Sequence, residues 1–290
     1  PYVAWNFKAA PGFFDIVTWD GTGSDLTLSH DLGSLPGMII TKRLDSGSDE
    51  WYVYHKSLPN ATENWIRLSN TAGANGPIGQ DLWGPPTSST FKVDTYMGLS
   101  TVGASYIAYI FADDTSNQIK CGKTSNMPMF TTEEVVCGFK PKFVMAKCIS
   151  EIGQWVMVDV ERGLHQQHQD ASYLYPNKNE EEGSTYETMN MNANEDGFIL
   201  KATNGAGEYI YIAIGENAET DVIADVYASG TVSASSGNTI TLSNTSGTWS
   251  TGMKVQGVTT DTKDNPDPIN PSTSVSYTHL RAHETVLDLV

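Results

Sequence analysis

Basic residues are scarce in this sequence. Its 290 residues include 17 Lys and Arg against 34 Asp and Glu, which gives a formal net charge of −17. Such a charge repels a polyanion, and the sequence has no stripe of Lys and Arg of the kind that phosphate contacts require. Nucleic acid and anionic membranes are therefore poor partners. The acidity fits a soluble surface that tolerates high salt, with calcium binding, which no specific motif supports, as the alternative.

Cysteine motifs and long apolar runs are also missing. Cys121, Cys137 and Cys148 form no C-x-x-C pair and are odd in number, so neither a zinc site nor a closed disulfide framework follows. We predict that they are buried as small apolar side chains. No apolar run approaches the roughly 18 residues of a membrane helix. The sequence begins at Pro1 without an initiator Met or a signal peptide, so we expect the true N-terminus to lie upstream.

Strand-forming and turn-forming residues are abundant. Hydrophobic residues make up 39% of the chain, enough for a sizeable core, while charged residues make up 18%. Val, Ile, Tyr, Phe and Trp fit a pleated, half-buried surface, and Gly, Ser, Thr and Asn suit the turns between strands. We therefore predict an all-β chain. The dipeptides Asp20-Gly21 and Asn75-Gly76 predict turns with positive φ.

A unit of about 104 residues is repeated along the chain. Residues 106–112 (YIAYIFA) are echoed at 209–215 (YIYIAIG), and residues 2–8 (YVAWNFK) are a third copy. Other pairs keep the spacing, namely 36–42 with 141–147, Trp51 with Trp155, Gly33 with Gly138, and Phe91 with Phe198. A period this long predicts whole β-domains, each with its own core, rather than the turns of a solenoid.

The repeat predicts the domain organisation. We expect residues 1–10 to be the last strand of a preceding repeat, and residues 11–113 and 114–217 to be two tandem β-sandwich-like domains. We expect a small truncated β-module at 218–260 and a linker at 261–274. Residues 106–112 are apolar on both faces, which predicts a central place in their sheet.

The composition changes abruptly after Pro271. Residues 275–285 (VSYTHLRAHET) resemble one reading frame of a transposon-type sequencing adapter, which implies that 275–290 is an unstructured artefact. The alternative is a short amphipathic helix in which Leu280, Ala282 and Leu287 share a face.

Catalytic signatures are weak. Asp159 and Glu161 are the best carboxylate pair, about 7 Å apart on one strand face and so within the range of a glycosidase. The first repeat has His55 and Ser57 there, so we expect solvated strand-end charges instead. No G-x-S-x-G elbow occurs, and no Cys or carboxylate motif completes a zinc site with His165 and His168. We expect no catalytic residues, cofactor or metal.

Aromatic residues are the remaining candidates for ligand binding. Sugar rings stack on aromatic side chains, and carbohydrate sites on β-sandwiches combine one or two of these with polar loop residues. Trp51 and Trp155 hold the same position in both repeats, which predicts a role in the core. Trp65 and Trp83 have no counterparts and stand beside Asn and Gly, so with Tyr96 they are our candidate carbohydrate-binding residues.

Four segments of the first repeat carry a resemblance: 12–18 (GFFDIVT), 30–40 (HDLGSLPGMII), 51–55 (WYVYH) and 103–109 (GASYIAY). The unit they mark, which covers residues 1–217, resembles domains found in tandem in tail-fibre and other virion proteins of marine bacteriophages. The resemblance implies a virion structural role with possible attachment to host-surface glycan, and it carries no known active-site residues. In the second repeat, 126–130 (NMPMF) is degraded and 179–182 (NEEE) replaces the Trp-containing loop, so we expect any ligand site in the first repeat.

These observations lead to one expected function and two alternatives. We expect a non-enzymatic, tail-fibre-like virion protein that is exposed outside the cell and forms a homo-oligomer, with a trimer as the typical fibre assembly. Its expected partners are a host-surface glycan or receptor and other virion proteins. The alternatives are a capsule-depolymerising tailspike whose catalytic part lies elsewhere and a bacterial surface adhesin.

Overall fold

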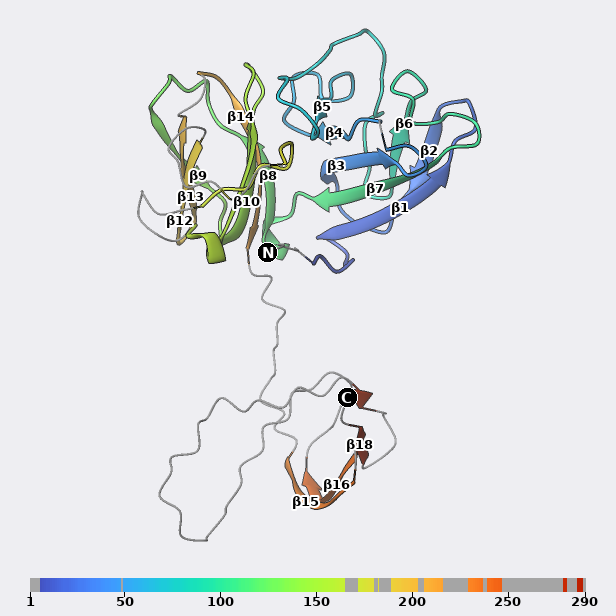
Figure 1. Cartoon of the computed structure of the whole chain (residues 1–290), viewed down its shortest axis with the longest axis vertical. Helices are drawn as coiled ribbons and strands as arrows, with labels where there is room; N and C mark the ends of the chain where they lie inside the picture. Colours follow the sequence, from blue (N-terminus) through green and yellow to red (C-terminus); the bar gives the residue numbers. More distant parts are fainter. Residues whose placement is uncertain are drawn as a thin grey trace. The chain divides into compact units, whose positions relative to one another are not determined.

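The computed structural model describes residues 6–47, 49–164, 172–179, 182, 189–202, 206–215, 229–236, 239–246, 279–280 and 286–288. The chain divides into two compact units, residues 1–217 and 218–290. The fold is all-β, as the composition predicts (Figure 1). The helical segments in these ranges are two single 3₁₀ turns, η1 (Thr115–Asn117) and η2 (Val160–Arg162). Neither is long and apolar enough to cross a membrane.

The first repeat forms a β-sandwich-like module, which we call module 1. Its large sheet is antiparallel, in the order β1 (Phe14–Asp20), β7 (Ser105–Ala112), β3 (Pro36–Arg43), β4 (Tyr52–His55) and β5 (Ile66–Arg67). Its small sheet pairs β2 (Leu26–Ser29) with β6 (Thr90–Val93). Aromatic side chains fill the space between the sheets: the Trp19 ring stacks on Tyr106 at 5.2 Å and meets Phe91 edge-on at 6.4 Å.

The second repeat forms a second module, module 2, whose large sheet shares the order of four strands with that of module 1. Its large sheet has the order β11 (Trp155–Asp159), β10 (Pro141–Cys148), β14 (Tyr209–Gly215) and β8 (Ile119–Lys123). Its small sheet has the order β12 (Met189–Asn194), β13 (Gly197–Ala202) and β9 (Thr132–Val136). Read in reverse, the order β8-β14-β10-β11 corresponds strand by strand to β1-β7-β3-β4 of module 1. The predicted central place of residues 106–112 is confirmed, because β7 lies between β1 and β3.

Individual residues of the two repeats share backbone features as well as positions. Gly33 and Gly138 both have positive φ, +68° and +83°, a conformation that favours glycine. The ladders that pair β3 with β7 and β10 with β14 both shift register just after their first proline, Pro36 and Pro141. The sequence repeat is therefore a structural repeat, and residues about 104 positions apart can be compared directly.

One of the two predicted turns needs its glycine for a different reason. Gly76 has a φ of +101°, as predicted. Gly21 does not have positive φ. A Cβ on Gly21 would lie 2.1 Å from the carbonyl oxygen of Thr101, so glycine is needed there because two loops pass close to each other.

The second unit contains a small antiparallel sheet in the order β15 (Ser229–Ser236), β16 (Thr239–Ser246), β18 (Val286–Asp288) and β17 (His279–Leu280). β17 and β18 lie in the segment that we predicted to be unstructured. The edge of β16 explains this difference, since an edge strand offers unpaired backbone groups to any extended segment. Residues 1–5 of the predicted first strand and the predicted linker at 261–274 lie outside the described residues.

The two modules share a hydrophobic core, contrary to the prediction that each domain buries only its own. One continuous cluster of buried side chains joins the core of module 1 to eight side chains of module 2: Ile119, Cys121, Met145, Ile149, Trp155, Ile210, Ile212 and Ile214. These side chains lie on the outer face of the large sheet of module 2, the face turned away from its small sheet. A second cluster fills the inside of module 2 alone. The large sheet of module 2 is therefore buried on both faces.

A glycine sets how closely the modules approach. A Cβ on Gly37 of β3 would lie 2.7 Å from the sulfur of Cys121 on β8, far inside van der Waals contact. Any other residue at position 37 would push the strands apart. The repeat places Lys142 at the corresponding position of module 2. Module 2 therefore cannot make the same close approach through its own β10.

Lys147 is buried at the interface between the modules. Its ammonium group donates to the carbonyls of Cys148 and Gly153 in module 2, at 3.0 and 2.9 Å, and to that of Thr71 in module 1, at 3.1 Å. Burial lowers the pKa of Lys147 to about 8. Its counterpart Lys42 is half-buried and donates to the carbonyl of Asp49 in its own module. Of the two lysines at this position of the repeat, only Lys147 therefore bridges the modules.

His55 makes a second polar contact across the interface. Its Nδ1 accepts from the backbone N–H of Ser57 at 3.1 Å, so Nε2 carries the proton and donates to the carbonyl of Tyr211 at 3.0 Å. The ring is buried, and desolvation lowers the pKa of His55 to about 4. The contact therefore uses the neutral imidazole.

We expect Lys147→Met to lower the free energy of unfolding by about 2 kcal/mol, because buried carbonyls from both modules lose a donor. The matched variant Lys42→Met is expected to cost less than about 1 kcal/mol, because Lys42 is half-exposed. Urea denaturation of the full chain at pH 7 measures both. Equal losses in the two variants would contradict the role given to Lys147.

Acidification is expected to weaken the fold through His55. The folded pKa of about 4 lies below the ordinary value of 6.5, so only the unfolded chain gains this proton as the pH falls from 6.5 towards 4. About 3 kcal/mol of stability is lost across that window. His55→Gln keeps an amide donor and does not titrate, so its stability should fall less between pH 6.5 and 4.5. Parallel pH profiles for the two proteins in urea denaturation would show that His55 does not contribute.

Candidate functional site

The carboxylate pair predicted on one strand face does not form. β11 ends at Asp159, and Glu161 lies in the 3₁₀ turn η2 that follows. Asp159 caps this turn: it accepts from the backbone N–H of Arg162 at 3.0 Å and pairs with the guanidinium of the same residue. Asp159 is buried, which corrects the prediction of a solvated strand-end charge. Its role is structural because its oxygens are held by the turn.

Histidine and cysteine side chains are likewise held in packing contacts. His30 is buried, and its Nδ1 accepts from the backbone N–H of Leu32 at 3.2 Å. The three cysteines are buried free thiols, as predicted. Burial raises the pKa of Cys137 to about 12, which disfavours the reactive thiolate. His165 and His168 lie outside the described residues, within which no group of three or more His, Cys, Asp or Glu could hold a metal ion.

The tryptophans take different places from those predicted. Trp83 is fully buried, its indole N–H donates to the carbonyl of Asn64 at 3.0 Å, and its ring packs on Tyr54. Trp83 therefore offers no ring face to a sugar. Trp155 is buried, which confirms its predicted core role. Trp51 is only half-buried and lies on the outer face of the large sheet of module 1.

Two of the three predicted site residues come together. Tyr96 is 60% exposed, and the ring of Trp65, which is 7% exposed, meets it edge-on with centroids 6.2 Å apart. The buried indole N–H of Trp65 has no hydrogen-bond partner. Tyr96 is thus an exposed ring in contact with a buried one.

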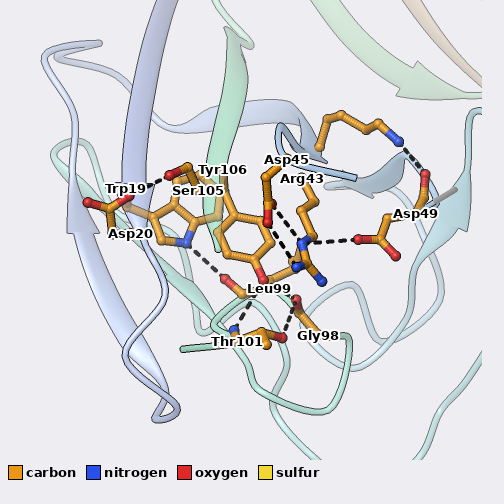
Figure 2. Close-up of polar contacts among 11 residues, drawn as sticks. Trp19, Asp20, Arg43, Asp45, Asp49, Gly98, Leu99, Thr101, Ser105 and Tyr106 are labelled. Carbon is orange, nitrogen blue, oxygen red and sulfur yellow. Dashed lines mark hydrogen bonds and ion pairs between the residues drawn. The ribbon is translucent and has the colours of Figure 1, made fainter. Parts of the chain in front are cut away.

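The loop that follows Tyr96 is held by side chains of strands β1 and β7, which bond to its residues Gly98, Leu99 and Thr101 (Figure 2). The indole N–H of Trp19 donates to the carbonyl of Leu99 at 2.8 Å. The hydroxyl of Tyr106 donates to the carbonyl of Gly98 at 2.7 Å and accepts from the backbone N–H of Thr101 at 3.1 Å. Two aromatic side chains of the core therefore fix the backbone at Gly98, Leu99 and Thr101, in a loop whose ends, Tyr96 and Thr101, are exposed.

A charged turn faces this loop. Arg43, the last residue of β3, donates from Nε and Nη2 to the two carboxylate oxygens of Asp45, at 2.8 and 3.0 Å (Figure 2). Its Nε also lies 3.3 Å from a carboxylate oxygen of Asp49. The hydrogen bonds from Arg43 lower the pKa of Asp45 below its ordinary value. The turn is thus an ordered set of exposed donors and acceptors.

A small pocket lies between the loop and the turn. Its volume is about 90 Å³, and it is lined by Arg43, Asp49, Glu50, Tyr52, Met97, Gly98, Leu99, Thr101 and Tyr106. Pockets that enclose a whole small molecule are usually about 300 to 1,000 Å³. This pocket can therefore hold ordered water or one small polar group of a larger ligand that lies mainly outside it.

The charged half of this site was not predicted from the sequence. Arg43, Asp45 and Asp49 fall within seven residues of one turn, and an arginine directly before such a cluster was the available signal. It gave no distance from Tyr96, which lies about fifty residues away in the sequence. Only the pairing of β3 with β7 places the turn opposite the loop, because it sets Arg43 beside Tyr106.

No curated protein and no solved structure matches the chain. Residues 1–218 match the family described as "Domain of unknown function (DUF7483)", and this match covers the two-module unit at 1–217. Because the match spans most of the chain, the protein belongs to the DUF7483 family.

Proposed function

We propose that this chain is a non-catalytic structural and binding segment of a tail-fibre-like virion protein, exposed outside the cell, and that it attaches to a host-surface glycan. The observation that carries the binding part is the exposed ring of Tyr96, which contacts Trp65 and begins the loop whose next residues, 97–99, line the small polar pocket at Arg43. The resemblance of the repeated unit to phage virion domains supports the virion part. Homo-oligomers, a trimer first among them, and contacts with other virion proteins belong to the same proposal.

The chemistry of the Tyr96 loop suits a carbohydrate. Sugars present one apolar face, which stacks on an aromatic ring, and a rim of hydroxyls, which needs fixed donors and acceptors. Tyr96 supplies the ring. Arg43, Asp45 and Asp49 supply the polar groups in an ordered turn. The pocket volume of about 90 Å³ suits one substituent of a chain end, with the remainder of the glycan outside.

The packing of the modules supports a structural role. His55, Lys147 and Asp159 are buried, and each has its polar atoms in hydrogen bonds that hold strands, turns or modules together. The net charge of −17 favours a neutral or cationic ligand over a polyanion.

We expect the full chain to bind one class of glycan on an array and Tyr96→Ala to weaken that binding about fivefold to tenfold, since an aromatic stacking contact contributes about 1 kcal/mol. Tyr96→Phe keeps the ring and should bind nearly as the wild type does. Ile152→Ala, which alters a side chain that is 77% exposed in module 2, is the control and should change nothing.

Other outcomes would favour the alternatives. Absence of glycan binding by the folded full chain would reject the binding part and leave a structural spacer. Binding that Tyr96→Ala leaves intact would place the site elsewhere. Shortening of a capsular polysaccharide by the full chain would contradict the non-catalytic role and favour a depolymerase. Recovery of the protein from a bacterial surface instead of from virions would favour an adhesin.

A further inference from the structure

The outer faces of the two large sheets are equivalent by sequence and topology, but different parts of them are covered. On module 1, Met38, Val53 and His55 are buried on this face, whereas the part nearer β1 is more exposed. In module 2 the outer face includes Cys121 on β8, Ile210 and Ile212 on β14, Lys147 on β10 and Trp155 on β11, and all five are buried. The repeat aligns them in turn with Ile16, Ile107, Tyr109, Lys42 and Trp51 of module 1. These five are half-buried or exposed.

The open face of module 1 is apolar and ordered. Tyr109 lies between two stacked neighbours, Phe14 at 6.4 Å on one side and Trp51 at 6.4 Å on the other. The ammonium group of Lys42 lies over the ring of Trp51 at 5.7 Å. Ile16, which pairs with Tyr109 across the strands, is 45% exposed. We call this surface, formed by Ile16, Lys42, Trp51, Ile107 and Tyr109, the acceptor face.

The matching face of module 2 is covered by one edge of module 1. The indole N–H of Trp155 donates to the carbonyl of Arg67 at 2.8 Å, and Lys147 donates to the carbonyl of Thr71. Val53 and Ile66, paired across β4 and β5, lie fully buried at this edge. Arg67, Thr71, Val53 and Ile66 form what we call the donor edge.

Module 2 has a donor edge of its own. The repeat aligns Val53 with Met157, and Met157 pairs with Leu174 just as Val53 pairs with Ile66. Met157 and Leu174 are half-buried, whereas their counterparts in module 1 are fully buried. Met157 also packs against the core cluster that the modules share, so this edge is only partly free. The unit therefore has a partly open acceptor face on module 1 and a partly open donor edge on module 2.

We propose that the acceptor face of one chain binds the donor edge of module 2 in a second copy of the same chain, head to tail. The contact would repeat between chains the one that joins the two modules within a chain. Trp51 and Lys42 stand where Trp155 and Lys147 donate to carbonyls of the covering edge, so the same two donors are present. This inference does not rest on the proposed glycan binding.

The contact between chains is weaker than the one within a chain. Lys142 stands at the position of Gly37 and Ile16 at that of Cys121, so the closest approach of the modules cannot be repeated. Asp159 replaces His55 and is held by Arg162, so the histidine contact is lost as well. Association is therefore reversible and depends on concentration. Because the two surfaces differ, it leads to a ring if the rotation closes and to an open string if it does not.

Sedimentation velocity of the full chain at increasing concentration tests this proposal. The weight-average mass should rise with concentration, towards three chains for a closed trimer or without a plateau for a string. Ile16→Asp places a charge on the acceptor face and should raise the apparent Kd about tenfold or more. Val102→Asp makes the same kind of change at a side chain that is 73% exposed on another loop, and it should leave the mass unchanged.

A mixing experiment separates head-to-tail contact from other geometries. Leu174→Asp blocks the donor edge, with the milder Met157→Ser as a second variant if the first does not fold. Ile16→Asp and Leu174→Asp should each be monomeric, but their equimolar mixture should form a complex of two chains and stop there, because one intact surface of each kind remains.

Four outcomes would overturn the proposal. They are a wild-type chain that stays monomeric up to millimolar concentration, association unaffected by Ile16→Asp, dimers of Leu174→Asp alone, and a mixture that does not associate. Dimers of Leu174→Asp would indicate that two acceptor faces pack on each other. Loss of glycan-array binding in Ile16→Asp, without any change in mass, would assign the face to a sugar ligand.

Discussion

The burial of the outer face of β10 and β14 against module 1 is the constraint on which the rest of the structure depends. Met145, Trp155, Ile210, Ile212 and Ile214 lose their contact with water there. Each buried side chain of this size contributes about 1.5 to 3 kcal/mol, so the five together contribute on the order of 10 kcal/mol. That equals the whole stability of many domains, about 5 to 15 kcal/mol. Module 2 therefore depends on module 1, and the two repeats form one structural unit.

The two faces of the large sheet in module 1 have separate roles in this account. The inner face carries Trp19 and Tyr106, which fix the loop at 96–101 and so preorganise the candidate glycan site. The outer face carries the proposed acceptor face and, nearer β5, side chains that are buried against module 2. Strand alternation explains how one short sheet does both, because neighbouring residues such as Tyr106 and Ile107 point to opposite faces. Substitutions at the proposed glycan site and on the proposed acceptor face can therefore be tested independently.

Much of the fold could be predicted from the sequence, because composition, periodicity and repeat spacing are local or collinear signals. They gave the all-β class, the central place of β7 and the burial of the cysteines. The shared core could not be predicted, because it depends on small differences between the repeats, such as Gly37 against Lys142. Trp83 and Asp159 were misjudged because local context does not show which side chains lie beneath a loop or cap a turn. The place of Arg43 opposite the loop could not be predicted, because it follows from the pairing of β3 with β7.

Native-state hydrogen exchange of the full chain tests most directly whether the two modules form one unit. In low concentrations of denaturant, the slowest amides of β3 and β7 and those of β10 and β14 should exchange through the same opening, with equal free energies and equal dependence on denaturant. Slow amides in β10 and β14 that stay protected after β3 and β7 have opened would contradict the account, because module 2 would then be stable without the surface that covers it.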